Sequence, residues 1–310
     1  MSVTFSGGGV TISGGWTLVA GPAGNKAIFG YGYTGSVTAV TNLVSSAGVV
    51  ATDTSGVGTA RSALAAAGYG TDKAIFGYGS TGTLTAITNL VSNTGVVATD
   101  TSGVGTARRY LAAAGYGTDK AIFGYGLVGG TMQSMTNLVS NTGAVATDTT
   151  GVGTARQSLG AAGYGTDKAI FGYGNGGTDL SITNKVSNTG VVATDTTGVG
   201  TARNAPTAAG YGTDKAIFGF GITSAAQSIT NLVSNTGVVA TDTTGVGTAR
   251  FSLAAAVYGT DKAIFSYGQL GSPTFGYTSI TNLVSNTGVV ATDTTGVGTA
   301  RNDLAAAAYG

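Results

Sequence analysis

The side chains that could do chemistry in this chain are few and belong to a narrow set of types. Its 310 residues include 14 Lys and Arg and 13 acidic residues, all of them aspartate, and no histidine or cysteine. Without imidazole or thiolate groups, the usual zinc, copper and iron–sulfur sites and nucleophile–histidine pairs are excluded. The net charge of +1 and the absence of a basic run also argue against nucleic-acid binding.

Most of the charged residues recur in identical surroundings along the chain. An aspartate stands in each ATDT motif, an arginine ends each GTAR motif, and an Asp-Lys pair stands in each TDK motif. We interpret these as ion pairs between neighbouring repeats or as turn caps. A repeated calcium site is disfavoured, because no loop clusters three oxygen-bearing side chains. Only Asp179 and Asp303 are unique carboxylates that could form a glycosidase pair, and we expect no enzyme.

These residues are carried by an internal repeat. The block KAIFGYG, with small variations, begins at Lys26 and returns at spacings of 47, 47, 48, 47 and 47 residues, and TNLVSNTGVVATDTTGVGTAR follows it each time. A period of this length suits one four-stranded propeller blade. In the second repeat, alternating apolar runs separated by Gly, Asn, Asp and Thr predict strands at 64–68, 73–78, 86–92 and 96–101. The sequence therefore predicts an all-β fold, a six-bladed β-propeller of four-stranded antiparallel blades.

The repeat resembles the kelch repeat. Phe76-Gly77-Tyr78-Gly79 stands where kelch repeats carry paired glycines, and Thr106-Ala107-Arg108 where they carry the arginine that opens the next inner strand. Two features depart from that pattern: Tyr78 splits the glycine pair, and Val96 and Val97 stand near the usual tryptophan. Tachylectin-like propellers are the alternative family. Kelch-like oxidases require Cys and His around copper, and sialidase-like propellers require Glu with an Arg cluster, so the resemblance implies no enzyme and no cofactor.

The two ends of the chain suggest how the repeats close. The last segment, 301–310, is a good copy of the inner-strand block, whereas the first KAIFGYG block has only a degraded copy before it, within 14–22. We expect the C-terminal strand to join the first blade, with 14–22 as the competing segment. Residues 1–25 would then be a leader or attachment segment, and residues 26–310 the propeller.

Variation between the repeats is concentrated in two places. All length differences fall between GYG and TN, and the pair after each arginine also changes, whereas the GYGTD and SNTG turns hardly vary. In an up-and-down blade both variable segments lie on one face, and a rigid scaffold with diverse loops is the usual arrangement for recognition. The predicted ligand-binding residues on this face are Tyr33, Arg109, Tyr110, Gln157, Asn175, Asp179, Asn204, Phe251, Gln269, Phe275, Tyr277, Asn302 and Asp303.

This mixture of side chains indicates the class of ligand. Aromatic rings stack on the C–H faces of sugars, and Asn, Gln and Asp exchange hydrogen bonds with hydroxyl groups. We therefore expect a binding head for a cell-surface glycan or protein, with a structural or assembly module as the alternative. The Gly-, Thr- and Val-rich leader joined to near-identical repeats also resembles bacteriophage tail-fibre and appendage proteins.

That second resemblance implies an extracellular or virion-surface location and attachment or oligomerisation through residues 1–25. The N-terminal sequence MSVTFSGGGVTISGG lacks the basic and apolar regions of a signal peptide. No apolar run is long enough to span a membrane. We expect no nucleic-acid partner and no bound metal.

Overall fold

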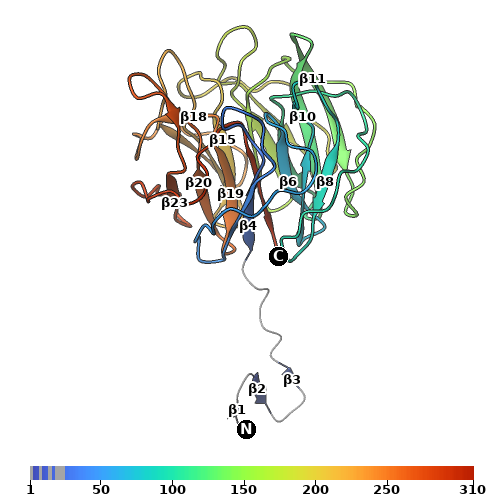
Figure 1. The fold of residues 1–310 in the computed structure, drawn as a ribbon, viewed down its shortest axis with the longest axis vertical. Helices are drawn as coiled ribbons and strands as arrows, with labels where there is room; N and C mark the ends of the chain where they lie inside the picture. Colours follow the sequence, from blue (N-terminus) through green and yellow to red (C-terminus); the bar gives the residue numbers. More distant parts are fainter. Residues whose placement is uncertain (1–2, 7–8, 13–15, 18–24) are drawn as a thin grey trace.

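The repeats fold into small antiparallel sheets and contain no helix. A computed structural model describes residues 3–6, 9–12, 16–17 and 25–310 (Figure 1). Within this part of the chain, no helix is long and apolar enough to cross a membrane. Each of six sheets has an inner, a middle and an outer strand. In this order the strands are β24 (Ala305–Tyr309), β4 (Lys26–Gly30) and β5 (Thr41–Val44); β6 (Ala65–Tyr69), β7 (Lys73–Gly77) and β8 (Thr88–Val91); β9 (Ala112–Tyr116), β10 (Lys120–Val128) and β11 (Thr131–Val139); β12 (Gly160–Tyr164), β13 (Lys168–Gly172) and β14 (Thr183–Val186); β15 (Thr207–Tyr211), β16 (Lys215–Gly219) and β17 (Thr230–Val233); β19 (Ala254–Tyr258), β20 (Lys262–Ser266) and β23 (Thr281–Val284).

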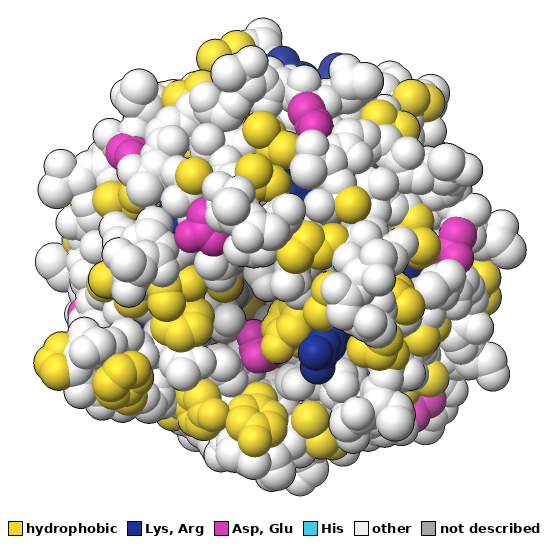
Figure 2. All heavy atoms as spheres, turned by 90° about the horizontal axis from the view of Figure 1, so that it is seen from above, with side chains coloured by type: hydrophobic (Ala, Val, Ile, Leu, Met, Phe, Trp, Pro, Cys, Tyr) yellow, Lys and Arg dark blue, Asp and Glu magenta, His cyan; other side chains and the backbone are white. Residues whose placement is uncertain are grey.

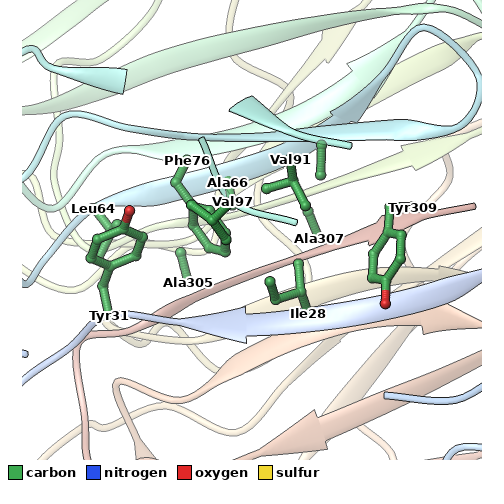
Figure 3. Packing of buried hydrophobic residues seen from close by; sticks show 11 residues of the cluster. Ile28, Tyr31, Leu64, Ala66, Phe76, Val91, Val97, Ala305, Ala307 and Tyr309 are labelled. Carbon is green, nitrogen blue, oxygen red and sulfur yellow. The ribbon is translucent and has the colours of Figure 1, made fainter. Parts of the chain in front are cut away.

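The middle strands show why this sequence forms packed sheets. Side chains alternate between the two faces of a strand, so Phe76 of β7 packs with Ile28 and Tyr31 of the preceding sheet, whereas Ile75 packs with Phe123 of the following one. The apolar side chains between two sheets are shown in Figure 3. Because both faces of each sheet are covered, the middle strands are apolar along nearly their whole length.

The inner strands contact one another in a closed cycle. β6 contacts β9, and the contacts continue through β12, β15, β19 and β24 back to β6. The inner strands are made of small residues such as Ala65, Ala66 and Ala67, which lets six strands approach a common centre. Each sheet therefore has two neighbours, and the series of sheets has no free end.

The C-terminal strand closes this cycle, as the sequence predicts. β24 pairs with β4 in antiparallel register, from Ala305 opposite Gly30 to Tyr309 opposite Lys26. Most of the competing segment 14–22 lies outside the described residues. Its described part, β3 (Trp16–Thr17), pairs instead with β2 (Gly9–Ile12), which pairs with β1 (Val3–Ser6).

The predicted fourth strand is not a regular strand. In the second repeat the stretch 96–101 meets β8 only through isolated bridges, Val91 with Val97 and Thr88 with Thr101. Side chains connect much of the rest: Asn89 donates to the Ala98 carbonyl at 3.0 Å and to Asp100 at 2.9 Å. The prediction of a strand at 96–101 is therefore wrong in this respect. The predicted inner strand at 64–68 is also shifted by one residue, to Ala65–Tyr69.

The repeated arginines connect neighbouring sheets from within. Arg61 is fully buried and stacks over the Tyr31 ring of the preceding sheet at 4.2 Å. Its guanidinium donates to the Tyr78 carbonyl at 2.9 Å and to Asn89 Oδ1 at 2.7 Å. The other five arginines at this position make equivalent bonds to the middle and outer strands of their own sheets.

The repeated aspartates act mainly as caps. Asp100 accepts hydrogen bonds from the backbone N–H and the hydroxyl of Thr59, in the segment that enters the sheet from the preceding repeat. The Asp-Lys pairs lie within single turns, as in Lys73 Nζ to Asp72 Oδ1 at 2.6 Å. Of the two sequence interpretations, the turn caps therefore describe these residues better than ion pairs between neighbouring repeats.

Candidate functional site: a variable face around a central cavity

Six residues form a closed ring where the inner strands begin. Each is the second residue after a repeated arginine, has a positive φ between 49° and 55°, and donates its backbone N–H to the carbonyl of the equivalent residue in the preceding repeat. These bonds measure 2.8 to 3.3 Å and return to their starting point, because Ala63 donates to Asp303. The ring residues are Ala63, Tyr110, Ser158, Ala205, Ser252 and Asp303.

The ring surrounds a central cavity of about 120 Å³. Alanine and leucine residues of all six inner strands form much of its wall, and Tyr110, Ser158, Ser252 and Asp303 add polar groups near the mouth. Figure 2 views the molecule from above Figure 1 and shows a hollowed centre, with acidic and basic side chains beside it. The variable ring position therefore decides the chemistry of this mouth.

The residue preceding each ring residue connects the ring to the loop after GYG. In each repeat it pairs with the first residue of that loop, as Gln157 does with Asn175 and Asn302 with Tyr33. The two variable segments, which are far apart in sequence, therefore lie side by side in every repeat. We call the ring, these pairs and the loops after GYG the variable face.

Part of the variable face is occupied by its own hydrogen bonds. Asp179 accepts from Asn204 Nδ2 at 2.7 Å and from Asn175 Nδ2 at 3.2 Å. Gln157 is half-buried and lies beside Asn175 through their backbone pairing. The amides of Asn175 and Asn204 and the carboxylate of Asp179 thus already have partners on this side of the mouth.

The sixth repeat builds an extra sheet on the variable face. Its longer loop forms β21 (Gln269–Leu270) and β22 (Gly276–Tyr277), and β21 also pairs with β18 (Arg250–Phe251). Phe275, near the loop tip, is 67% exposed. The Tyr277 ring meets Tyr33 of the first repeat edge to face, with ring centroids 6.1 Å apart. Aromatic side chains from two neighbouring repeats therefore lie together.

Asn302 differs from the expectation that it is accessible to a ligand. It is only 6% exposed, and its Nδ2 donates to Gln269 Oε1 at 3.0 Å. The backbone pairing with Tyr33 places Asn302 beneath the loops of the first and sixth repeats, which explains this burial. Only its Oδ1 lacks a hydrogen-bond partner among the described residues.

Arg109, Tyr110 and Asp303 form the ionisable part of the mouth. The Arg109 guanidinium lies over the Tyr110 ring, 5.1 Å from its centroid. Burial raises the pKa of the Asp303 carboxyl, and the Ser252 hydroxyl and the positive charge of Arg109 partly oppose this shift. Burial also raises the pKa of Tyr110, with a contribution from the charge of Asp303. Asp303 is thus surrounded by protein atoms but remains partly accessible at the mouth.

Comparing the repeats within the sequence did not single out several residues of this face. Ser158 and Ser252 line the cavity beside Tyr110 and Asp303, but small serines gave no reason to single them out. Their position, two residues after the arginine, was the available signal. Leu127 and Ile222 pair with Arg109 and Asn204 at loop positions held by polar or aromatic residues in other repeats.

At the opposite ends of the inner strands the surface is made of repeated residues. A cavity of about 320 Å³ is lined there by residues such as Tyr69, Thr71 and Lys73 and by their counterparts. A second ring of six backbone hydrogen bonds, of 2.7 to 2.8 Å, links the repeats at this end, and Asn25 takes the place held elsewhere by aspartate. The two ends thus share a closed backbone but differ in side-chain diversity.

In comparisons with known proteins, the chain matches no family model and no curated protein sequence.

Proposed function

We propose that the chain is a six-bladed, kelch-like β-propeller in which the irregular stretch of each repeat serves as the fourth strand. The support is the closed cycle of inner-strand contacts, the hydrogen-bonded ring at each end and the pairing of β24 with β4. Propellers remove open sheet edges by arranging blades around a central channel. The sequence contains six repeats, one for each proposed blade.

We further propose that this propeller is a non-catalytic binding head for a cell-surface glycan or protein. One observation carries the proposal: the repeats differ mainly at positions that lie around one mouth. Drift without selection would favour small residues beside a crowded channel, yet the six pairs include Arg109, Tyr110, Gln157 and Phe251. Rigid aromatic and planar polar side chains on a fixed scaffold suit recognition.

The proposed setting is an appendage outside the cell or on a virion. Residues 1–25 precede the first repeat, and Asn25 lies at the constant end of the channel. A leader attached there would leave the variable face directed away from the point of attachment. This arrangement suits a receptor-binding or adhesin head of the kind found on bacteriophage tail fibres.

The test compares binding of the labelled chain to printed glycans and to intact bacterial cells. A triple variant, Tyr110→Ala, Phe251→Ala and Tyr277→Ala, removes aromatic groups from the variable face, and Ala63 already holds the position equivalent to Tyr110. We expect binding to fall at least about tenfold. The control, Thr94→Ala, Thr142→Ala and Thr189→Ala, changes the constant turns, where Ala47 is the natural equivalent. Equal binding by the two triple variants would contradict the proposal.

A second candidate is a structural module that packs in an assembly. Val49, Val96, Val191, Val238 and Val289 are 61% to 66% exposed and recur just after the turn that leaves the outer strand in five of the six repeats. Exposed apolar groups repeated in this way would suit contacts with neighbouring subunits. Contacts through these valines in the native assembly, with a solvent-facing variable face, would favour this function over recognition.

A further inference from the structure

The variable face contains the two buried side-chain polar atoms that have no hydrogen-bond partner among the described residues. They are Arg109 Nε, a donor, and Asn302 Oδ1, an acceptor. Leaving a buried polar atom without a hydrogen-bond partner is unfavourable. The six repeated arginines, by contrast, are buried with their guanidinium groups hydrogen-bonded. These two exceptions therefore mark the variable face as the part of the described residues whose buried polar groups are incompletely paired.

Both atoms belong to one side of the mouth. Asp303 follows Asn302 and is separated from Tyr110 in the ring by Ala63 alone. Burial is the main reason that the pKa values of Asp303, Tyr110 and Tyr277 are raised. The charge of Arg109 partly opposes the shift at Asp303, and the charge of Asp303 adds to the shift at both tyrosines. We define the open sector as Tyr33, Arg109, Tyr110, Tyr277, Asn302 and Asp303.

The other side of the mouth offers less to a ligand. There Asn175 and Asn204 both donate to Asp179, and the ring positions are Ser158 and Ala205. Asn175, Asp179 and Asn204 bond to one another, whereas the two buried polar atoms without a partner among the described residues both lie in the open sector. The asymmetry points to a site beside the axis of the channel.

We propose that the open sector binds one uncharged pyranose ring of a glycan. A sugar carries neighbouring hydroxyl groups, each of which donates and accepts, and these match the carboxyl of Asp303 and the guanidinium donors of Arg109, while the buried Asn302 positions Gln269 through its Nδ2. Its C–H face suits stacking on Tyr33, Tyr110 or Tyr277. This inference rests on the proposed function, because it names the ligand class of the same face.

Charge and size favour this ligand over an acidic sugar or a protein surface. The sector holds one guanidinium and one carboxyl group and no cluster of like charges, so it offers no charged site built for an acidic or an amino group. The adjoining cavity, of about 120 Å³, is small and walled by alanine and leucine, and suits a single end group. A protein partner would instead depend on the exposed Phe275 at the loop tip.

The experiment is an NMR titration of the ¹⁵N-labelled full chain with glucose, galactose, mannose and N-acetylglucosamine, one at a time. At least one sugar should produce saturable shifts of the Arg109 Nε–H and of the side-chain amides of Asn302 and Gln269. Asn302→Ser and Asp303→Ser should each lower the affinity for that sugar at least about tenfold. Serine is natural at both positions in other repeats, at Ser62 and Ser252, so the backbone ring should persist.

The control variant is Asn141→Ser in a constant turn, where the first repeat carries Ser46. It should leave sugar affinity within about twofold of the parent. Absence of saturable shifts with all four sugars, or shifts confined to residues outside the open sector, would overturn this inference. If the aromatic triple variant lost binding to cells or printed glycans while none of the four sugars bound the open sector, the recognition function would stand and only the pyranose site would be rejected.

Discussion

At the scale of single residues, buried guanidinium groups hold adjacent sheets together. Arg156 donates to the Tyr173 carbonyl at 2.9 Å, the Thr154 carbonyl at 3.1 Å and Asn184 Oδ1 at 2.7 Å, and it lies over the Tyr125 ring at 4.2 Å. Arginine presents donors in a planar fork that lysine cannot reproduce. The side chain thus connects three acceptors and a neighbouring sheet at once.

Arg156→Lys should therefore lower the free energy of unfolding by about 3 kcal/mol, because the ammonium group leaves buried acceptors unpaired. Urea denaturation followed by circular dichroism measures this loss. Lys185→Leu serves as the control, since Leu is the repeat residue at this partly exposed position and only the bond from Lys185 Nζ to the Thr236 carbonyl is lost. Equal midpoints for both variants would contradict the role given to the guanidinium.

The raised pKa of Asp303 predicts a pH-dependent stability. Above about pH 4 the carboxyl ionises in the unfolded chain, while the folded chain keeps its proton until the higher pKa is passed. The folded state binds more protons in this interval, so the free energy of unfolding falls as pH rises through it.

Asp303→Ser should remove this dependence. The difference in unfolding free energy between wild type and variant, measured by urea denaturation from about pH 4 to about pH 7, should shift in favour of the variant as pH rises. The six cap aspartates, whose pKa values are lowered, are present in both proteins and cancel in the difference. A difference that stays constant over this range would contradict the burial of Asp303.

At the scale of elements, the turn after GYG is set by glycine. Gly79 and Gly82 both have a φ of 106°, which disfavours other residues. A Cβ at Gly79 would also lie 2.7 Å from the Ser62 carbonyl oxygen and 3.0 Å from Leu64 Cβ, whereas one at Gly82 would meet no atom within 4 Å. The first glycine is thus required by packing as well as by conformation.

Gly79→Ala should therefore destabilise the protein by at least about 1 kcal/mol more than Gly82→Ala, since both share the conformational strain and only one adds overlap. Thermal unfolding of the two variants under the same conditions gives the comparison. The two variants unfolding at the same temperature would show that the turn yields and that the close approach is unimportant.

The sequence was informative about elements wherever short apolar runs lie between turn residues. The KAIFG strands and the TNLV strands were predictable in this way, as the run Ala74, Ile75 and Phe76 illustrates. The fourth strand was not, because the stretch 96–101 pairs with its neighbour only at two isolated bridges and is held between them by side chains such as Asn89 and Asp100. Propensity and alternation do not report such side-chain networks.

At the scale of the whole molecule, the last strand completes the first sheet. Deleting residues 301–310 removes β24 and Arg301, exposes an edge of β4 and breaks both backbone rings. The truncated chain should lose cooperative unfolding or form oligomers by strand exchange, as read by thermal denaturation and light scattering. Deleting residues 1–24 should leave the melting temperature and the oligomeric state of the repeats unchanged. A monomeric, cooperative 1–300 chain would contradict closure through β24.

The sequence also predicted which residues of the variable face lie together, but not how each is used. The positions where the repeats differ do gather around one mouth, as the pairing of Gln157 with Asn175 illustrates. The burial of Asn302 under two loops and the partnership of Asp179 with Asn204 depend on distances between repeats, which a residue pattern does not contain.

The most direct test is a chain whose six repeats all carry the second repeat's loop, 80–87, and its Ser62-Ala63 pair. Every constant residue, both backbone rings and the buried arginines would be retained, so the circular dichroism spectrum and the oligomeric state should match those of the parent. We predict that this uniform chain no longer binds the printed glycans or intact cells recognised by the natural chain. Undiminished binding by a correctly folded uniform chain would contradict recognition through the variable face.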